Sequence, residues 1–148
     1  MKSITTEITI DAPAKVVWET LTALDDYASW NPFVIEAEGK VAVGSRLVVG
    51  IQPPGKKVTK FRPTVTVADE EKKFEWLGHL GIRGLFDGRH QYLLEETADG
   101  GTRFVHSEEF TGVLVPLVLR MMGDTRAGFE AMNQALKDRA EAVARERG

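Results

Sequence analysis

The stretch LFDGRHQYLLEETADGGTRFVHSEEFTG, residues 85–112, decides the fold of this chain. Two runs of alternating polar and apolar residues flank the turn sequence Asp99-Gly100-Gly101, and this arrangement is typical of a β-hairpin. Side chains two positions apart share one face of a strand, so each run has one face that carries its large apolar residues. These faces carry Phe86, His90, Tyr92 and Leu94 in the first run and Phe104, His106, Glu108 and Phe110 in the second. The hairpin therefore sets titratable side chains among apolar ones, as the wall of a ligand pocket does.

The length of the turn decides which residues of the hairpin face each other. A loop of three residues, 98–100, pairs even-numbered positions with each other, whereas a two-residue turn would pair even with odd. With the longer loop, Tyr92 lies opposite His106 and His90 lies opposite Glu108. We therefore expect both faces to line one cavity, with the His90 imidazole within hydrogen-bonding reach of the Glu108 carboxylate.

Outside the hairpin the same alternation predicts further strands. There are seven in all, at residues 3–10, 34–39, 46–52, 58–68, 72–80, 85–97 and 102–111, and the turns between the last six predict an antiparallel meander. Two short helices are expected between the first two strands, and the second must end before Pro32 because proline disfavours helical geometry in the preceding residue. Apolar residues at helical spacing over 115–145 predict a long amphipathic helix, which can bend or break at Gly123 and Gly128.

Length and composition limit the class of protein. A chain of 148 residues that is 43% hydrophobic has the size of one globular domain, so we expect a single domain over 1–148. The net charge of −3 and the lack of a basic run argue against nucleic-acid binding. The chain has no cysteine, its start lacks a signal-peptide pattern, and no window approaches the roughly 20 apolar residues that span a bilayer. We therefore expect a cytoplasmic protein with no stable membrane insertion.

The histidines and glycines do not follow the patterns of cofactor sites. His79, His90 and His106 lack the short spacings of metal ligands, and the glycines of 78–88 do not form a phosphate-binding motif. We therefore expect no metal and no cofactor. His79 has the opposite strand parity from Trp76, so its side chain is predicted to point to solvent or toward a partner.

Several short motifs carry a resemblance to a known superfamily. They are ITIDAP at 8–13 followed by VVW at 16–18, WNP at 30–32, FDGRH at 86–90, TRFVH at 102–106 and FTG at 110–112. Together with the order strand, two short helices, six strands and long helix, they resemble the START-like, or SRPBCC, superfamily, which includes polyketide cyclase/dehydrase-like proteins. The resemblance implies an α+β helix-grip fold, in which a curved seven-stranded antiparallel sheet wraps around the C-terminal helix and leaves an apolar cavity between them.

A ligand in such a cavity is expected to contact nine side chains. They are Trp76, His90, Tyr92, Phe104, His106, Glu108, Phe110, Phe129 and Met132. His90, His106 and Glu108 are also the candidate catalytic residues, because a buried carboxylate beside an imidazole can pass a proton. In the alternative interpretation, His90 and Glu108 only satisfy each other's hydrogen bonds, and Trp76 and Met132 are core residues.

Three functions remain open at this point. The first is binding of a small hydrophobic molecule, such as a lipid, an isoprenoid or an aromatic polyketide-like compound. The second is a cofactor-independent polyketide cyclase/dehydrase-like enzyme that uses His or Glu for proton transfer. The third is a protein-interaction module like the heat-shock ATPase activators, ranked last because the polar residues of the hairpin point inward. The apolar run 111–115 is expected to form a ligand gate or a homodimer contact.

Overall fold

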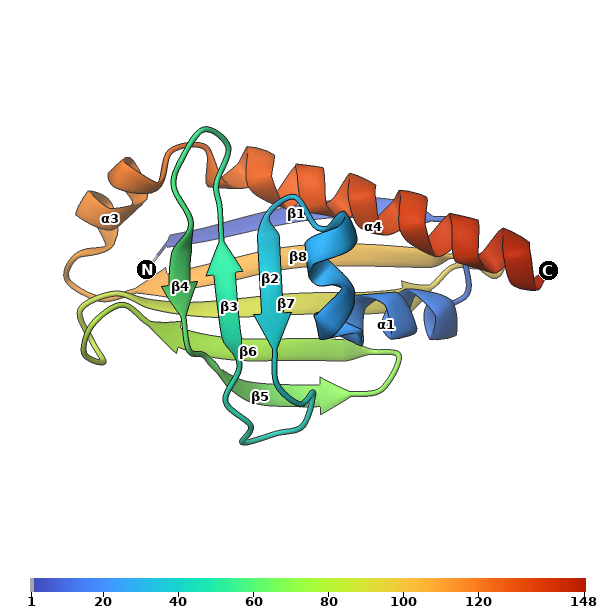
Figure 1. The fold of residues 1–148 in the computed structure, drawn as a ribbon, viewed down its shortest axis with the longest axis horizontal. Coiled ribbons are helices and arrows are strands. Elements are labelled where there is room, and N and C mark those ends of the chain that lie inside the picture. Colours follow the sequence, from blue (N-terminus) through green and yellow to red (C-terminus); the bar gives the residue numbers. More distant parts are fainter. Residues whose placement is uncertain (1) are drawn as a thin grey trace.

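The computed structural model describes residues 2–148, and its strands form two antiparallel sheets (Figure 1). The larger sheet has the order β1-β8-β7-β6-β5 and the smaller one the order β2-β3-β4. The larger sheet consists of β1 (Lys2–Ile10), β5 (Thr64–Asp69), β6 (Lys73–His79), β7 (Asp87–Glu96) and β8 (Thr102–Thr111). The smaller sheet consists of β2 (Val34–Glu38), β3 (Val48–Ile51) and β4 (Thr59–Phe61). The described residues thus form eight strands in two sheets, where the sequence predicted seven in one.

The hairpin of β7 and β8 has the predicted register. Tyr92 pairs with His106, and His90 pairs with Glu108. Even-numbered residues are buried along both strands except Glu96, the last residue of β7, while the odd-numbered ones are half-buried or exposed. Gly100 has a φ of 88° in the turn, a conformation that glycine adopts without steric cost.

The strand predicted over 58–68 is wrong, because the chain leaves one sheet there and enters the other. The break falls between β4 and β5, at Pro63, which has no N–H to give to a strand ladder. The carbonyl of Pro63 accepts a hydrogen bond from Leu47 N at 2.8 Å, and Arg46 forms an isolated bridge with Thr64. This segment therefore joins the two sheets.

The helices agree with the prediction, and the long helix breaks at Gly123, one of the two glycines at which a bend or break was expected. Helices α1 (Ala14–Thr22) and α2 (Tyr27–Trp30), with a 3-10 turn between them, connect β1 to β2 as expected. The helix predicted over 115–145 is two helices, α3 (Val115–Met122) and α4 (Thr125–Arg147). They separate at Gly123, which has φ 73° and ψ −142°, and the Asp124 side chain begins α4 by accepting a hydrogen bond from Ala127 N.

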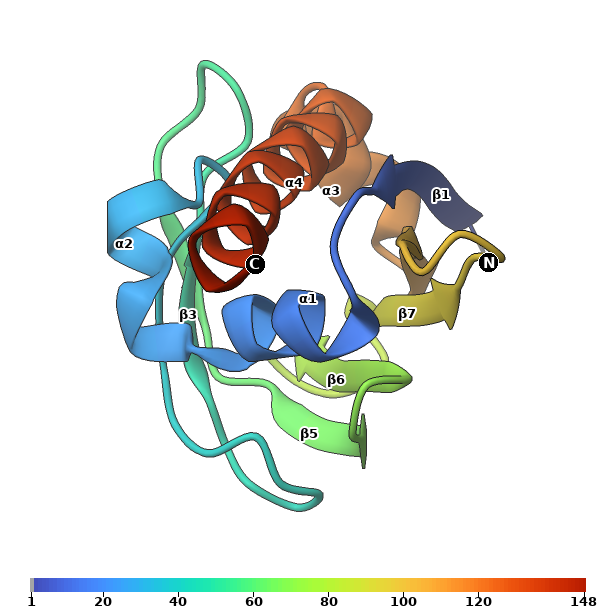
Figure 2. The ribbon, with the colours of Figure 1, turned by 90° about the vertical axis from the view of Figure 1, so that its right-hand side faces the viewer.

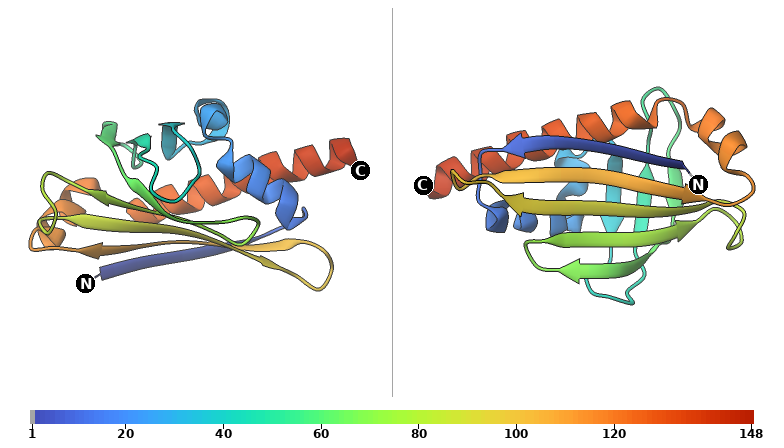
Figure 3. Two further views of the ribbon diagram at one scale, coloured as in Figure 1. Left: turned by 90° about the horizontal axis from the view of Figure 1, so that it is seen from below. Right: turned by 180° about the vertical axis from the view of Figure 1, so that it is seen from behind.

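The two sheets enclose α4. Figure 2 looks along this helix and shows the smaller sheet with α2 on one side of it and the larger sheet with α1 on the other. In Figure 3 the larger sheet is a curved layer with α4 lying across one face. Phe129, Met132 and Leu136 of α4 are fully buried in this interface. This is the α+β helix-grip arrangement, with a long C-terminal helix packed on an antiparallel sheet. Within residues 2–148, no helix combines the length and the apolar character needed to cross a membrane.

Candidate functional site

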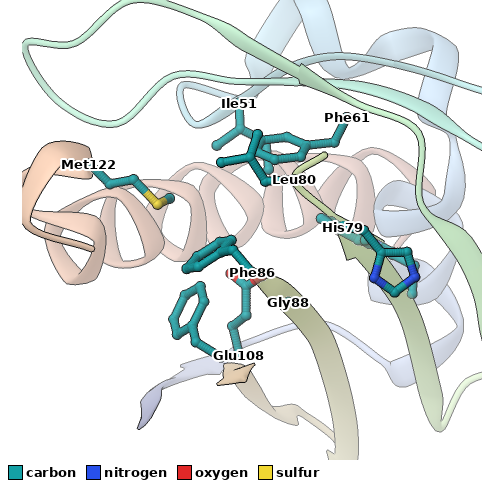
Figure 4. A pocket seen from close by; sticks show the side chains of 11 residues that line it. Ile51, Phe61, His79, Leu80, Phe86, Gly88, Glu108 and Met122 are labelled. Carbon is teal, nitrogen blue, oxygen red and sulfur yellow. The ribbon is translucent and has the colours of Figure 1, made fainter. Parts of the chain in front are cut away.

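Open space lies at the end of the sheet next to α3. Figure 4 shows its inner part, a pocket whose apolar walls come from both sheets and from α3. These walls are the side chains of Ile51, Phe61, Trp76, Leu80, Phe86, Phe110 and Met122. The inner pocket has a volume of about 20 Å³, which is room for about one water molecule. An outer pocket of about 270 Å³ shares four of these walls and adds Lys56, Lys57, Val118 and Met121.

Glu108 brings a carboxyl group to the wall of this apolar pocket. It lies on β8 and is 8% exposed. A Cβ atom at the neighbouring Gly88 would stand 2.3 Å from Oε2 of Glu108, so glycine at that position makes the room for the carboxyl group. On the core side, Oε1 of Glu108 lies 3.2 Å from Nδ1 of His90.

The nine predicted ligand contacts fall into two groups. Trp76, Glu108 and Phe110 line the inner pocket. The other six line neither pocket and are at most 1% exposed: His90, Tyr92, Phe104, His106, Phe129 and Met132. They are buried because α4, which carries Phe129 and Met132, packs directly on the other four, with the Phe129 ring stacked 4.0 Å from the His106 ring. The cavity expected between the sheet and the C-terminal helix is therefore filled along α4, and the inner and outer pockets lie toward α3.

A chain of buried hydrogen bonds begins behind Glu108. The Nε2 atoms of His90 and His106 are 2.6 Å apart. Nδ1 of His106 lies 2.8 Å from Oδ1 of Asn133, on α4, and Nδ2 of Asn133 donates to Oγ1 of Thr6 at 2.8 Å. The Thr6 hydroxyl donates to the backbone carbonyl of His106 at 3.1 Å. The chain thus joins the pocket to β1 and α4 through side chains that solvent does not reach.

The donor-to-acceptor direction of these buried hydrogen bonds follows from the last of them, at Thr6. The hydroxyl of Thr6 has one hydrogen and gives it to a carbonyl, so Asn133 donates to Thr6 and turns its amide oxygen toward His106. His106 therefore carries its hydrogen on Nδ1 and accepts at Nε2 from His90. In this arrangement His90 donates from Nε2, and its Nδ1 lies 3.2 Å from Oε1 of Glu108.

Burial supports this assignment. Desolvation is the largest cause that lowers the pKa of His106 well below its usual value, and the neighbouring His90 is the next. His106 is therefore neutral, as it must be to donate from Nδ1 and accept at Nε2. Nδ1 of His90 is close to Glu108, but its direction is not that of a hydrogen bond, and no group within the described residues 2–148 bonds it. A buried nitrogen without a partner is costly and is rare in folded proteins. This unsatisfied atom lies directly behind the pocket wall.

Some residues of the site were not predicted from the sequence. Ile51, Phe61, Leu80 and Met122 are ordinary apolar residues, and their pattern does not separate a pocket wall from a core. The sequence does contain a signal for Asn133 and Thr6, because each is a polar residue on the inward face of an otherwise apolar stripe.

His79, predicted to point to solvent or toward a partner, is half-buried and lies at the edge of the inner pocket's lining. Its Nδ1 lies 2.7 Å from Oδ1 of Asp87, and its ring turns away from the apolar side chains of the pocket (Figure 4). Within residues 2–148, no group of three or more His, Cys, Asp or Glu side chains could hold a metal ion.

Solved structures share this fold at low sequence identity. The aromatase/cyclase Zhui from Streptomyces sp. R1128 is 16% identical, with a TM-score of 0.77 over 99% of this chain and 98% of its own. A START superfamily protein from Mycobacterium smegmatis is 16% identical, with a TM-score of 0.71 over 95% and 98%. Norcoclaurine synthase from Thalictrum flavum is 16% identical, with a TM-score of 0.73 over 96% and 95%. At this identity the likeness concerns the fold alone.

Sequence comparison gives the family. A search of curated proteins returned no match. Residues 1–141 match the model of the family described as polyketide cyclase / dehydrase and lipid transport, which is nearly the whole length of the chain. The protein therefore belongs to the polyketide cyclase / dehydrase and lipid transport family.

Proposed function

We propose that the protein is a single START-like domain, residues 1–148, that binds a small apolar molecule with one polar group. The apolar body lies in the outer pocket, between α3 and the smaller sheet, and the polar group contacts Glu108. The observation that carries this proposal is the carboxyl group of Glu108 at the inner end of a mostly apolar pocket, which opens to the surface beside Lys56 and Lys57. Pockets for small molecules are typically apolar with a few placed polar groups. Family membership supports the same conclusion.

The size of the pocket narrows the choice of ligand. A volume of about 270 Å³ is at the lower end of the roughly 300–1,000 Å³ usual for ligand pockets. A molecule with two fused rings or a short chain fits this space, while a lipid or a larger polyketide-like molecule requires α3 to move outward. Gly123, which separates α3 from α4, is a natural position for that movement.

The first experiment is native mass spectrometry of freshly purified protein, followed by organic extraction of any bound compound. A retained apolar molecule identifies the ligand class directly. Binding is then measured with 2-naphthol, and with naphthalene as the matched probe that lacks the hydroxyl group. We expect Glu108→Gln to lower the affinity for 2-naphthol about tenfold, because a hydrogen bond to a charged group contributes about 1.5–3 kcal/mol and the neutral one that replaces it about 0.5–1.5 kcal/mol. The affinity for naphthalene stays the same.

Glu109→Gln is the matched control, because Glu109 is the next residue of β8 and lies on the opposite face, where it accepts a hydrogen bond from Gln91. This variant should bind both probes like the wild type. The proposal fails if neither probe binds and no molecule co-purifies, or if Glu108→Gln and Glu109→Gln have equal effects on 2-naphthol.

A second function is favoured by one specific observation, the unsatisfied Nδ1 of His90 beside Glu108. This pair could remove a proton from a carbon next to a ketone and return it to an oxygen, which is the proton transfer of a cofactor-independent cyclase or dehydrase. Heptane-2,6-dione is a suitable probe, because intramolecular aldol addition and loss of water convert it to 3-methylcyclohex-2-enone. We expect the enone to form faster with the wild type than with Glu108→Gln. Equal rates for the wild type, the variant and buffer would contradict an enzymatic role.

A further inference from the structure

Exposed apolar side chains gather around the mouth of the pocket. Eight large apolar residues within the described part of the chain are well exposed, and seven of them lie in three segments, 53–58, 80–85 and 112–123. The seven are Val58, Leu80, Ile82, Val113, Leu114, Leu117 and Met121, and the most exposed are Val113 at 76%, Ile82 at 70% and Met121 at 68%. We call these three segments the mouth surface.

Contacts show that the mouth surface is continuous. Leu80, Lys56 and Met121, one from each segment, line the same outer pocket. The segment 80–85 is also bonded to 112–123, because Leu114 N donates to Leu85 O at 2.9 Å and Val113 N to Gly84 O at 3.4 Å. In Figure 1 the β6–β7 loop and α3 lie together at the end of the molecule away from the C-terminus.

The charge of the mouth surface differs from that of the rest of the protein. Its three segments contain Lys56, Lys57, Arg83 and Arg120, all exposed, and no aspartate or glutamate. The rest of the chain has 15 basic and 22 acidic residues, since the whole chain has 19 and 22. A protein with a net charge of −3 thus presents cations together with its exposed apolar residues.

We propose that the mouth surface docks on an anionic phospholipid membrane. Ile82 and Leu117 enter the boundary between head groups and acyl chains, while Arg83 and Arg120 contact lipid phosphates. Apolar residues interspersed with Lys and Arg are the chemistry that binds such an interface reversibly. The charges favour this occupant over a second copy of the chain, because two such surfaces would bring like charges together. Docking also places the opening of the pocket against the membrane, so an apolar ligand could pass between them without crossing water.

The test is co-sedimentation with vesicles at low ionic strength. The vesicles are phosphatidylcholine alone or phosphatidylcholine with roughly a third phosphatidylserine. We expect binding to the anionic vesicles only, and loss of that binding at high salt, because exposed charges are screened. Arg83→Gln/Arg120→Gln should weaken it about 25-fold, since each cation near an anionic surface contributes about fivefold. Ile82→Ser/Leu117→Ser should also weaken binding at low salt, although it leaves every charge of the mouth surface in place.

Two variants are matched controls. Arg139→Gln/Arg145→Gln removes two exposed cations from α4 outside the mouth surface, and Val43→Ser removes the eighth exposed apolar side chain, which is 68% exposed. Both should bind vesicles like the wild type. The proposal is overturned if the wild type binds neither kind of vesicle or binds neutral and anionic vesicles equally well. It is also overturned if the control variants lose as much vesicle binding as the variants of the mouth surface. A dimer in sedimentation velocity that Ile82→Ser/Leu117→Ser dissociates, without vesicle binding, would assign the surface to a second copy instead.

This proposal and the proposed function can fail separately. Arg83→Gln/Arg120→Gln should bind 2-naphthol like the wild type, because neither arginine lines the inner or the outer pocket. Glu108→Gln should bind anionic vesicles like the wild type, because Glu108 is buried. Loss of vesicle binding with intact naphthol binding therefore contradicts only the docking surface.

Discussion

Asn133 holds the buried hydrogen-bond chain in one direction, because its amide donates to Thr6 and accepts from His106. We expect Asn133→Leu to lower the free energy of unfolding by about 1–3 kcal/mol, the cost of leaving a buried polar group without a partner. Gln134→Leu is the control, because Gln134 is exposed and bonds only Asp138 one turn away. Urea denaturation of the two variants measures the difference, and equal losses would contradict the role of Asn133.

The buried His106 should make the stability of the protein depend on pH. Burial lowers its pKa well below its usual value, so the folded protein leaves it neutral while the unfolded chain protonates it below about pH 6.5. The unfolded state then binds more protons, so stability should fall as the pH falls, by up to about 1.4 kcal/mol per pH unit from this residue.

Urea denaturation at several pH values between about 5 and 7.5 measures this slope, over the range that brackets the unfolded pKa. We expect His106→Gln to flatten it. Tyr92→Phe is the control, because it removes a buried hydroxyl group directly opposite His106. Burial raises the pKa of Tyr92 well above its usual value, so this hydroxyl group does not titrate between about pH 5 and 7.5. An unchanged slope in His106→Gln would show that other groups cause the acid sensitivity.

Gly88 and Gly78 are direct partners across β7 and β6, and they should respond oppositely to alanine. A Cβ at Gly88 would meet the Glu108 carboxyl group, whereas a Cβ at Gly78 would lie 3.6 Å from Pro63, an ordinary contact. We expect Gly88→Ala to displace Glu108, to lower 2-naphthol affinity and to cost about 1–3 kcal/mol of stability. Gly78→Ala also adds a methyl group to the lining of the inner pocket, but that methyl group makes no close contact, so this variant should gain up to about 1 kcal/mol of stability. Equal stability of the two variants would show that Glu108 has room to move.

Among the elements, the break between α3 and α4 depends on Gly123. A non-glycine residue adopts φ 73° with ψ −142° only under strain, so Gly123→Ala should cost about 1–3 kcal/mol. Gly55→Ala tests the cost of φ alone, because Gly55 also has φ 73° and a Cβ there would meet nothing within 4 Å. Thermal unfolding compares the two. A Gly123→Ala protein as stable as the wild type would indicate that α3 and α4 can join into one helix.

Local patterns predicted some elements better than others. The register of β7 and β8 follows from strand parity and loop length, both of which are local, so His90 and Glu108 were placed correctly opposite each other. The split of strand 58–68 depends on Pro63, whose effect on the backbone is also local. The hydrogen bond that Pro63 accepts comes from Leu47, in another part of the chain, and the local pattern does not predict that contact. Parity also showed that Tyr92 and His106 point inward. It could not show that Phe129 of α4 would cover them, because that contact is set by how the helix crosses the sheet.

For the whole molecule, the position of the pocket depends on which inward residues α4 covers. Along α4, aromatic rings of the larger sheet and the ring of Phe33, just before β2, fill the interface, and at α3 the turn at Gly123 leaves space open. Neither the length of α4 nor its crossing path is visible in the periodicity of 115–145. The fold and its inward-facing residues could therefore be predicted, but which of them reach a ligand could not.

The topology of the whole molecule predicts its folding rate. β1 pairs with β8, so residues such as Lys2 and Phe110 must meet across most of the chain. Proteins with many such distant contacts fold in about milliseconds to seconds, and we expect the same here. Stopped-flow refolding from urea, followed by the fluorescence of the buried Trp18 and Trp76, measures it. Refolding in microseconds would mean that the β1–β8 pairing forms after the observed step.

The pairing of β1 with β8 also matters during synthesis on the ribosome. The first strand emerges about a hundred residues before its sheet neighbour has been made, and α4, which covers the concave face, follows later still. Throughout that time β1 offers unpaired backbone groups and the apolar side chains Ile4, Ile8 and Ile10 to any other chain nearby. Slower initiation of translation and a lower expression temperature reduce association between such incomplete nascent chains. Both changes should therefore raise the yield of folded protein.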